Sequence, residues 1–295
     1  MDRARVDRAA WTAIRVLVLS CVALLLLIAG VLFSKSIPLL SSVPLTNLLF
    51  SSKWFPLRGE FGFMAFIIGT LMVTLMAMLL SVPVSLLTAI YLSEYASTRV
   101  RDAVKPLIDL LAGIPSVIFG LWGVAFVVPA VRYSIAPLFG VNTTGYCVLS
   151  AGVVLAIMVF PLIISVAEEV LRAVPSVLRE TAYSLGATRW QTVKHVVLKE
   201  ASVGVLASVI LGFTRAIGET MAVLMVVGNV AQAPRTVFDA AYPLPSLIAN
   251  NYGEMMSLPL YDSALMFAAL VLLLVVAGFT ILARTLPRRV ARLQQ

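Results

Sequence analysis

Six long apolar stretches, separated by shorter polar segments, dominate the pattern of hydrophobic and polar positions along the chain. Each approaches or exceeds the length of about 20 residues that a helix needs to cross a bilayer. Prolines inside three of them are tolerated in a helical membrane bundle, because neighbouring helices satisfy the freed carbonyls. The predicted spans cover about 11–33, 61–91, 104–131, 146–166, 203–227 and 264–282.

The composition agrees with this pattern. Apolar residues make up 61% of the 295 positions and charged residues 12%, with a mean hydropathy of +1.02. A soluble domain has about 45–50% apolar and about 25% charged residues. These values exclude a soluble enzyme, a disordered protein and a disulfide scaffold. The predicted fold class is an all-α polytopic membrane protein with six transmembrane helices.

The net charge of +8 indicates how the chain is oriented in the membrane rather than nucleic-acid binding, because most basic residues lie on one side of the predicted spans. Sixteen Lys and Arg residues flank the spans on that side, five lie on the other, and Arg215 falls inside a span. Cytoplasmic loops carry the excess of Lys and Arg. Both termini are therefore predicted to be cytoplasmic in a prokaryotic inner membrane.

The expected organisation has three parts. Residues 1–60 hold an N-terminal flank, the first transmembrane helix and an external segment, and 61–285 form the transmembrane core. Within the core, 168–201 is a cytoplasmic loop and 231–262 an external loop. Residues 286–295 form a basic cytoplasmic tail.

The cytoplasmic loop carries the sharpest local signals. Pro175 suits the first position of a helix, Gly186 suits its left-handed C-terminal turn, and Thr188 with Gln191 has the form of a capping box that opens a second helix. The loop therefore predicts helix, glycine turn, helix. A surface hairpin that merely joins two spans is the alternative. The first helix has an apolar stripe formed by Val174, Leu178, Ala182 and Leu185.

The same loop contains Glu180-Thr181-Ala182, three residues, Gly186, nine residues, and Val196-Val197-Leu198. This pattern resembles the EAA loop of ABC-transporter permeases. The resemblance implies a coupling helix that sits in a cleft of a cytoplasmic ATPase, with contacts from Glu180, Ala182, Leu185, Gly186 and Arg189. Thr181 replaces the usual alanine. Lys199 replaces the usual proline, which leaves open whether the next helix runs on without a break.

A second resemblance narrows the substrate. The stretch Gly212–Val223 reads GFTRAIGETMAV and is similar to a segment of phosphate-transporter permeases of the PstC type. Further agreement at 52–56, 69–71, 111–120 and 246–250 extends the likeness from about residue 50 to the sixth span. It implies a MetI-like permease fold and phosphate import. The implied partners are a PstA-type sister permease, two PstB-type ATPase subunits and an extracytoplasmic PstS-type phosphate-binding protein.

Arg215 and Glu219 are candidates for the substrate pathway on physical grounds. A charge near the centre of a span costs about 2.5–3.5 kcal/mol on insertion scales, so such residues face the bundle interior or a pathway. Their spacing of four on one helix allows an ion pair. A guanidinium also matches phosphate oxygens in a two-pronged contact. A purely structural ion pair is the alternative, and Thr214 and Thr220 are weaker candidates that can bond their own helix carbonyls.

No Gly-Lys pair occurs in the chain, so it has no phosphate-cradling P-loop of its own. No nucleophile with a base and no metal-ligand spacing is present, which predicts a transport subunit without an ATPase site, catalytic residues, metal or cofactor. A permease for sulfate, molybdate or tungstate is the alternative within the class. Outside this class, the alternative is a stand-alone secondary transporter or channel. Such a protein would need no docking helix, so the loop at Glu180–Gly186 argues against it.

Overall fold

The computed structural model describes residues 3–254, 258 and 260–292, and most of them are helical. Residues 293–295 of the predicted basic tail, and 255–257 and 259 of the predicted external loop, lie outside the described part. Five helical stretches there are long and apolar enough to cross a membrane, and a sixth counts if a bent pair forms one span. When the bent pair is counted as one span, the total of six agrees with the number predicted from the sequence, although two spans differ in their bounds.

Four of the predicted spans match long helices. The first lies in α1 (Arg3–Ser42), and the second in α3 (Met64–Ile90), which continues into a π-helical turn, η2 (Tyr91–Tyr95). The fourth corresponds to α8 (Val148–Arg172), and the last lies in α15 (Tyr261–Arg292). Pro83 and Pro161 lie inside α3 and α8, as expected of a bundle in which neighbours compensate the missing N–H.

The predicted third span, 104–131, is wrong in its bounds. Residues 98–113 form a separate amphipathic helix, α4 (Thr98–Gly113), and the apolar stretch of spanning length runs from Ser116 to Leu138. Ile114 has extended φ and ψ angles because the following Pro115 disfavours the helical region for the residue before it. The stretch that follows comprises α5 (Ser116–Trp122), η3 (Gly123–Val127), α6 (Val128–Ala130), η4 (Val131–Ile135) and α7 (Ala136–Leu138).

The predicted fifth span, 203–227, is not one helix. α12 (Ser202–Ile217) ends at Gly218, and a short helix, α13 (Met221–Val226), begins three residues later. At its other end, α12 meets the helix over Arg189–Glu200 at a bend of 71°. That helix consists of α10 (Arg189–Thr192), η5 (Val193–Val197) and α11 (Leu198–Glu200).

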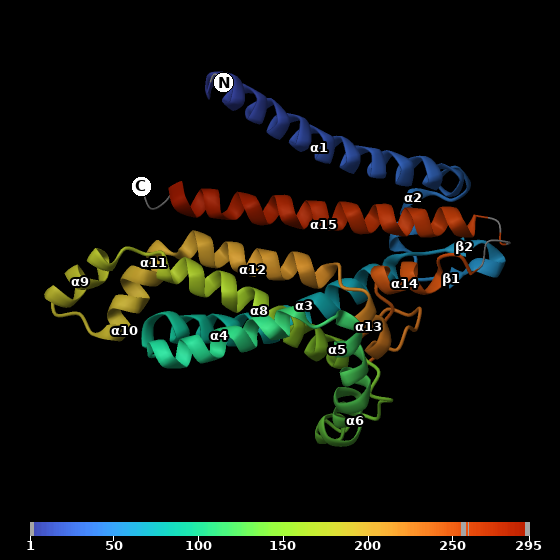
Figure 1. Cartoon of the computed structure of the whole chain (residues 1–295). Coiled ribbons are helices and arrows are strands. Elements are labelled where there is room, and N and C mark those ends of the chain that lie inside the picture. Colours follow the sequence, from blue (N-terminus) through green and yellow to red (C-terminus); the bar gives the residue numbers. More distant parts are fainter. Residues whose placement is uncertain (1–2, 255–257, 259, 293–295) are drawn as a thin grey trace.

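The long helices run between two distinct ends of the molecule (Figure 1). One end, the loop end, carries α9 (Ser176–Ser184) and α10, and the start of α1 and the end of α15 point toward it (Figure 1). The other, the hairpin end, carries α2 (Leu45–Phe50) and α14 (Leu244–Asn251). Its antiparallel hairpin pairs β1 (Trp54–Phe55) with β2 (Glu60–Phe61) through η1 (Pro56–Arg58).

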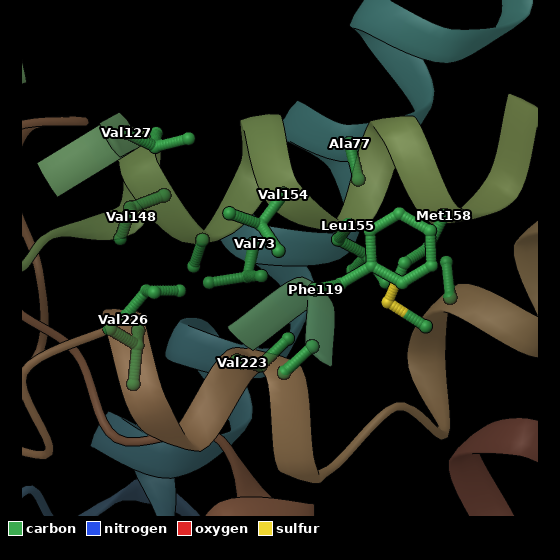
Figure 2. Close-up of a cluster of buried hydrophobic side chains, with 14 of the residues drawn as sticks. Val73, Ala77, Phe119, Val127, Val148, Val154, Leu155, Met158, Val223 and Val226 are labelled. Atoms are coloured by element: carbon green, nitrogen blue, oxygen red, sulfur yellow. The ribbon is translucent and has the colours of Figure 1, made fainter. Parts of the chain in front are cut away.

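The central core lies where α3, α5, α8 and α13 meet. Figure 2 shows Val73, Ala77, Phe119, Leu155 and Val223 from these four helices gathered into one apolar cluster. Glycines allow the helices to approach closely, as in other membrane bundles. A Cβ on the α8 residue at position 152 would lie 2.6 Å from a side-chain carbon of Met76 on α3. This close contact makes α3 and α8 the rigid centre of the fold.

A second cluster joins the hairpin end to α3 and α15. The Trp54 ring packs edge-on against Phe61, Phe63 and Phe66, and lies 6.3 Å from the ring of Tyr261. These side chains fix the hairpin against the first turns of two long helices.

Candidate functional site

The loop between α8 and α12 folds as its sequence predicts. Pro175 precedes the first residue of α9, Leu185 ends it, and Gly186 has a φ of +82°. The amide of Ala187 donates to the carbonyl of Ala182 at 3.1 Å, which closes the helix in the left-handed turn typical of a C-terminal glycine. The helix, glycine turn and second helix are confirmed.

The capping box is also confirmed. The Thr188 hydroxyl accepts from the amide of Gln191 at 3.3 Å, and the Gln191 side-chain oxygen accepts from the amide of Thr188 at 2.8 Å. These reciprocal bonds satisfy two amides that a helix start otherwise leaves free. They fix where α10 begins relative to Gly186.

The predicted apolar stripe of α9 is only half right. Val174 and Ala182 are buried, but Leu178 is half-exposed and Leu185 is 83% exposed. Val177 and Trp190 are exposed as well. The helix therefore packs on the bundle through one narrow edge. It leaves an exposed set of apolar side chains, called here the apolar tip and defined as Val177, Leu178, Leu185 and Trp190.

Of the other residues implied for ATPase contact, Glu180 is exposed on α9 and Gly186 lies in the exposed turn. Arg189 instead turns toward the bundle: its guanidinium donates to the backbone carbonyl of Glu94 and lies 4.7 Å from the centre of the Tyr95 ring. Ala182 faces inward too. Of this set only Ala182 is buried, whereas Arg189 stays exposed while it bonds residue 94.

Although Lys199 replaces the usual proline, the helix of the loop does not run on into α12 without a break. The chain breaks at Ala201 and turns by 71° into α12, although no proline stands there. Ala201 is buried in a cluster with Ala167, Leu171 and Val197. Packing against α8, rather than a proline, accompanies the sharp exit of the loop.

Arg215 and Glu219 do not form the ion pair that their spacing suggested. Arg215 lies in the last turn of α12, whereas Glu219 follows the helix end at Gly218. Within the described residues no ion pair joins them, and the Glu219 carboxylate accepts from the amide of Ala222 at 3.4 Å. The physical reason is the helix break, since residues four apart face each other only on a continuous helix. Arg215 is exposed on the surface of the single chain.

The two threonines bond locally. The Thr214 hydroxyl donates to the carbonyl of Ile210 at 2.9 Å, within its own helix, and the Thr220 hydroxyl donates to the carbonyl of Gly218 at 3.3 Å. Back-bonding of this kind is common for hydroxyls in membrane helices. Neither hydroxyl is held toward a ligand.

Two adjoining clefts lie beyond α13, with volumes of about 690 and 670 Å³. They share part of their lining, and Arg235 lines the first while Arg132 lines the second. The side-chain oxygen of Asn229, in the second, is buried and has no donor among the described residues. The shared residues are Thr144, Tyr146, Val230 and Ala240.

The loop joining the clefts to α14 is held by Asp239. Its carboxylate accepts from the amides of Arg235 at 2.9 Å and Thr236 at 2.8 Å. The bond from the Thr236 amide, aided by the bond and charge of Arg235, holds the pKa of Asp239 below its usual value against the opposing effect of burial.

Sequence reasoning missed two carboxylates at the loop end. Glu94 binds Arg179, and the buried Glu168 binds Arg172 at 3.4 Å and approaches Lys105 at 4.0 Å. An acidic residue at the end of a span was a usable signal, because a buried carboxylate requires a partner. Arg172 lies four residues from Glu168, but the Arg179 partner of Glu94 lies 85 positions away in the sequence.

The chain is similar in sequence to known membrane transport proteins. Residues 81–292 match the family described as "Binding-protein-dependent transport system inner membrane component". The chain is 38% identical over 260 residues to the phosphate transport system permease protein PstC of Xylella fastidiosa (strain 9a5c), covering 83% of this chain and 80% of that one. It is 36% identical over 281 residues to the PstC of Mesorhizobium japonicum, covering 90% and 85%.

The fold is similar to that of solved transporters. An inward-facing structure of the MetNI methionine ABC transporter superposes with a TM-score of 0.59 at 21% identity, covering 75% of this chain and 93% of that chain. At this identity the likeness concerns the fold alone. It agrees with the predicted MetI-like arrangement of helices.

Proposed function

Because this chain belongs to the family of binding-protein-dependent transport system inner membrane components, we propose that it is the phosphate permease subunit of an ATP-driven importer. Permeases of this family are membrane-spanning transport components that work with an ATPase and a substrate-binding protein. Phosphate is the substrate that the names of the similar chains give. Family membership also argues against a stand-alone secondary transporter or channel.

The position of Arg215 is the observation that carries the transport role. An exposed guanidinium in the last turn of a membrane helix is costly if it faces lipid, because a charge within the bilayer is strongly disfavoured. It is acceptable where the helix borders a water-filled path or another subunit. With no anionic partner among the described residues, the guanidinium is available to bind an anion through its planar pair of N–H groups.

The position of Glu219 supports a path beside Arg215. Its carboxylate lies just past the break and caps the short α13, so this chain has a discontinuous helix at the depth of the charged residues. Membrane transporters tolerate broken helices where the freed backbone groups line a cavity or are buried in protein. We assign Arg215 to anion contact and Glu219 to shaping the adjacent turn. Thr214 and Thr220 border this path without holding the anion.

The apolar tip of α9 supports coupling to an ATPase. The side chains of the apolar tip are all exposed on the loop between α8 and α12. Apolar surface of this kind marks a protein contact when its surroundings are polar. Glu180 and Gly186 lie beside it. The buried Ala182, and Arg189 through its contacts with residues 94 and 95, hold the loop in place.

The full assembly in this proposal has a PstA-type sister permease, two PstB-type ATPase subunits and a PstS-type phosphate-binding protein outside the membrane. Both termini and the loop end face the cytoplasm, in accord with the excess of Lys and Arg at that end. The clefts lined by Arg132 and Arg235 then face outward, where the binding protein releases its anion.

The test is ATP hydrolysis by the purified complex in lipid nanodiscs. Phosphate-loaded binding protein should stimulate hydrolysis severalfold, and removal of this permease should abolish the stimulation. Stimulation by sulfate, molybdate or tungstate with their own binding proteins, and not by phosphate, would transfer the assignment to the other oxyanions. No stimulation by any loaded binding protein would refute the proposal.

A further inference from the structure

The loop end contains an ion pair between Glu94 and Arg179 that has no role in the function proposed above. Glu94 lies in η2, at the end of α3, and its side chain is 6% exposed. Its carboxylate accepts two hydrogen bonds from Arg179 of α9: Nε to Oε2 at 3.2 Å and Nη2 to Oε1 at 2.7 Å. A two-pronged pair of this kind fixes orientation as well as distance.

The same guanidinium also reaches α8. Arg179 Nη2 donates to the carbonyl of Leu171 at 2.9 Å, and Nη1 donates to the carbonyl of Val174 at 2.6 Å. Leu171 lies in the last turn of α8, where helix carbonyls lack intrahelical partners. One side chain of α9 therefore joins the ends of two long helices, α3 and α8.

The second helix of the loop attaches at the same place. Arg189, the first residue of α10, donates to the backbone carbonyl of Glu94 and stacks on Tyr95. Both helices of the loop thus bind the two consecutive residues 94 and 95. The attachment runs through Arg179 and Arg189, whereas the residues of the apolar tip remain exposed.

η2 belongs to one continuous helical segment with α3, which contains Pro83. α3 follows without a break, and Val73 and Ala77 of α3 pack with Phe119 and Val223 in the central core (Figure 2). Val223 belongs to α13, which begins directly after the break at Glu219. Energetic coupling between distant sites is carried by such packed side chains and secondary elements when they have two discrete arrangements. A shift of Glu94 therefore has a continuous route to the turn beside Arg215.

We propose that Glu94 is the positioning residue through which movement of the coupling loop is passed to the second span. Arg179 is its partner on α9, and Arg189 keeps α10 in register with it. The inference rests on the proposed function, because it assumes an ATPase on the apolar tip. It adds a specific prediction: binding of the ATPase and transmission of its movement use different residues.

The test is Glu94→Gln in the full transport complex, reconstituted with ATP on the ATPase side and phosphate-loaded binding protein on the other. The amide keeps the size of the side chain but loses the charge and the two-pronged acceptor. ATPase subunits should co-purify as in wild type, and stimulated ATP hydrolysis should stay within about twofold. Phosphate uptake per ATP hydrolysed should fall about tenfold, within the range of ordinary coupling free energies.

Glu169→Gln is the matched control. Glu169 lies one turn from the end of α8, is exposed, and its side chain has no partner among the described residues. The Glu169→Gln substitution removes the same charge at the same end of the molecule, and it should leave the phosphate uptake per ATP hydrolysed unchanged. Arg179→Lys should reproduce the defect, because an ammonium cannot bond both carboxylate oxygens and both carbonyls. The double variant should be no worse than either single one, as expected for residues that act as a unit.

Three results would overturn the inference. One is an unchanged ratio of uptake to hydrolysis in Glu94→Gln while the wild-type complex is coupled, which leaves the proposed function intact. The second is parallel loss of ATPase association, hydrolysis and uptake, which marks Glu94 as purely structural. The third is a wild-type complex that phosphate-loaded binding protein does not stimulate, which refutes the proposed function as well.

Discussion

Arg215 and Glu219 lie on either side of a helix break: Arg215 belongs to the last turn of α12, and Glu219 bonds the amide of Ala222 at the start of α13. The guanidinium is therefore held by the end of one helix and the carboxylate by the start of the next. Because the two charges do not neutralise each other, Arg215 keeps its binding capacity for an anion.

Replacing Arg215 by lysine should lower phosphate uptake even though the charge is kept. An ammonium cannot reproduce a two-pronged contact. Loss of one hydrogen bond to a charged group, about 1.5–3 kcal/mol, corresponds to a fall of about tenfold or more. Uptake and membrane abundance should be measured together, with Arg58→Lys in η1 as the control. Wild-type uptake by Arg215→Lys would show that the side chain does not contact the anion.

Gly186 should tolerate asparagine but not valine. A Cβ at this position meets nothing within 4 Å, so any effect comes from the φ of +82° alone. The left-handed region costs most residues about 1–2 kcal/mol, while asparagine enters it more readily. Gly186→Val should weaken ATPase co-purification and uptake, and Gly186→Asn should largely keep both. Equal behaviour of the two variants would show that the turn conformation is unimportant.

Thr70 should contribute more to stability than Thr74. The amide of Leu244 donates to the Thr70 hydroxyl at 2.9 Å, across 174 positions of the chain, whereas the Thr74 hydroxyl bonds only the carbonyl of Thr70 in its own helix. Thr70→Val leaves a buried amide unsatisfied, at a cost of about 1–3 kcal/mol. Thermal unfolding in detergent should show a lower Tm for Thr70→Val than for Thr74→Val. A Tm that is equal or reversed would contradict this assignment.

The loop held by Asp239 should be insensitive to pH across the neutral range. The folded-state pKa is below the usual value of 3.8, so the carboxylate stabilises the loop above that value. This stabilisation is lost as the pH falls through the lowered pKa. Hydrogen exchange of the Arg235 and Thr236 amides, corrected for intrinsic rates, should stay constant from neutral pH to about pH 5. Asp239→Ala should remove their protection at all pH values, and loss of wild-type protection near neutral pH would contradict the assignment.

The loop between α8 and α12 could be predicted in detail because its signals are local. Gly186 and the pair Thr188 and Gln191 lie within five positions of each other, and local backbone geometry decides the result. The resemblance carried by Glu180, Ala182 and Gly186 in the same loop also led to the family.

Other features depend on contacts that a single sequence does not display. Glu94 and Arg179 are 85 positions apart, so their pairing becomes visible only when α9 is packed against η2. The break after Gly218 was missed because apolar residues flank Arg215–Thr220 on both sides, and the two apolar segments together have the length of one span. The bond from Arg189 to the backbone carbonyl of Glu94 depends on the same packing.

The most direct measurement of the central claim is uptake of radiolabelled phosphate into proteoliposomes that contain this permease, its sister permease and the ATPase subunits. ATP is supplied to the side carrying the ATPase, and phosphate-loaded binding protein to the opposite side. The account predicts accumulation that requires ATP, the binding protein and this chain, and that excess sulfate does not suppress. Accumulation without ATP, or competition by sulfate equal to that by phosphate, would contradict it.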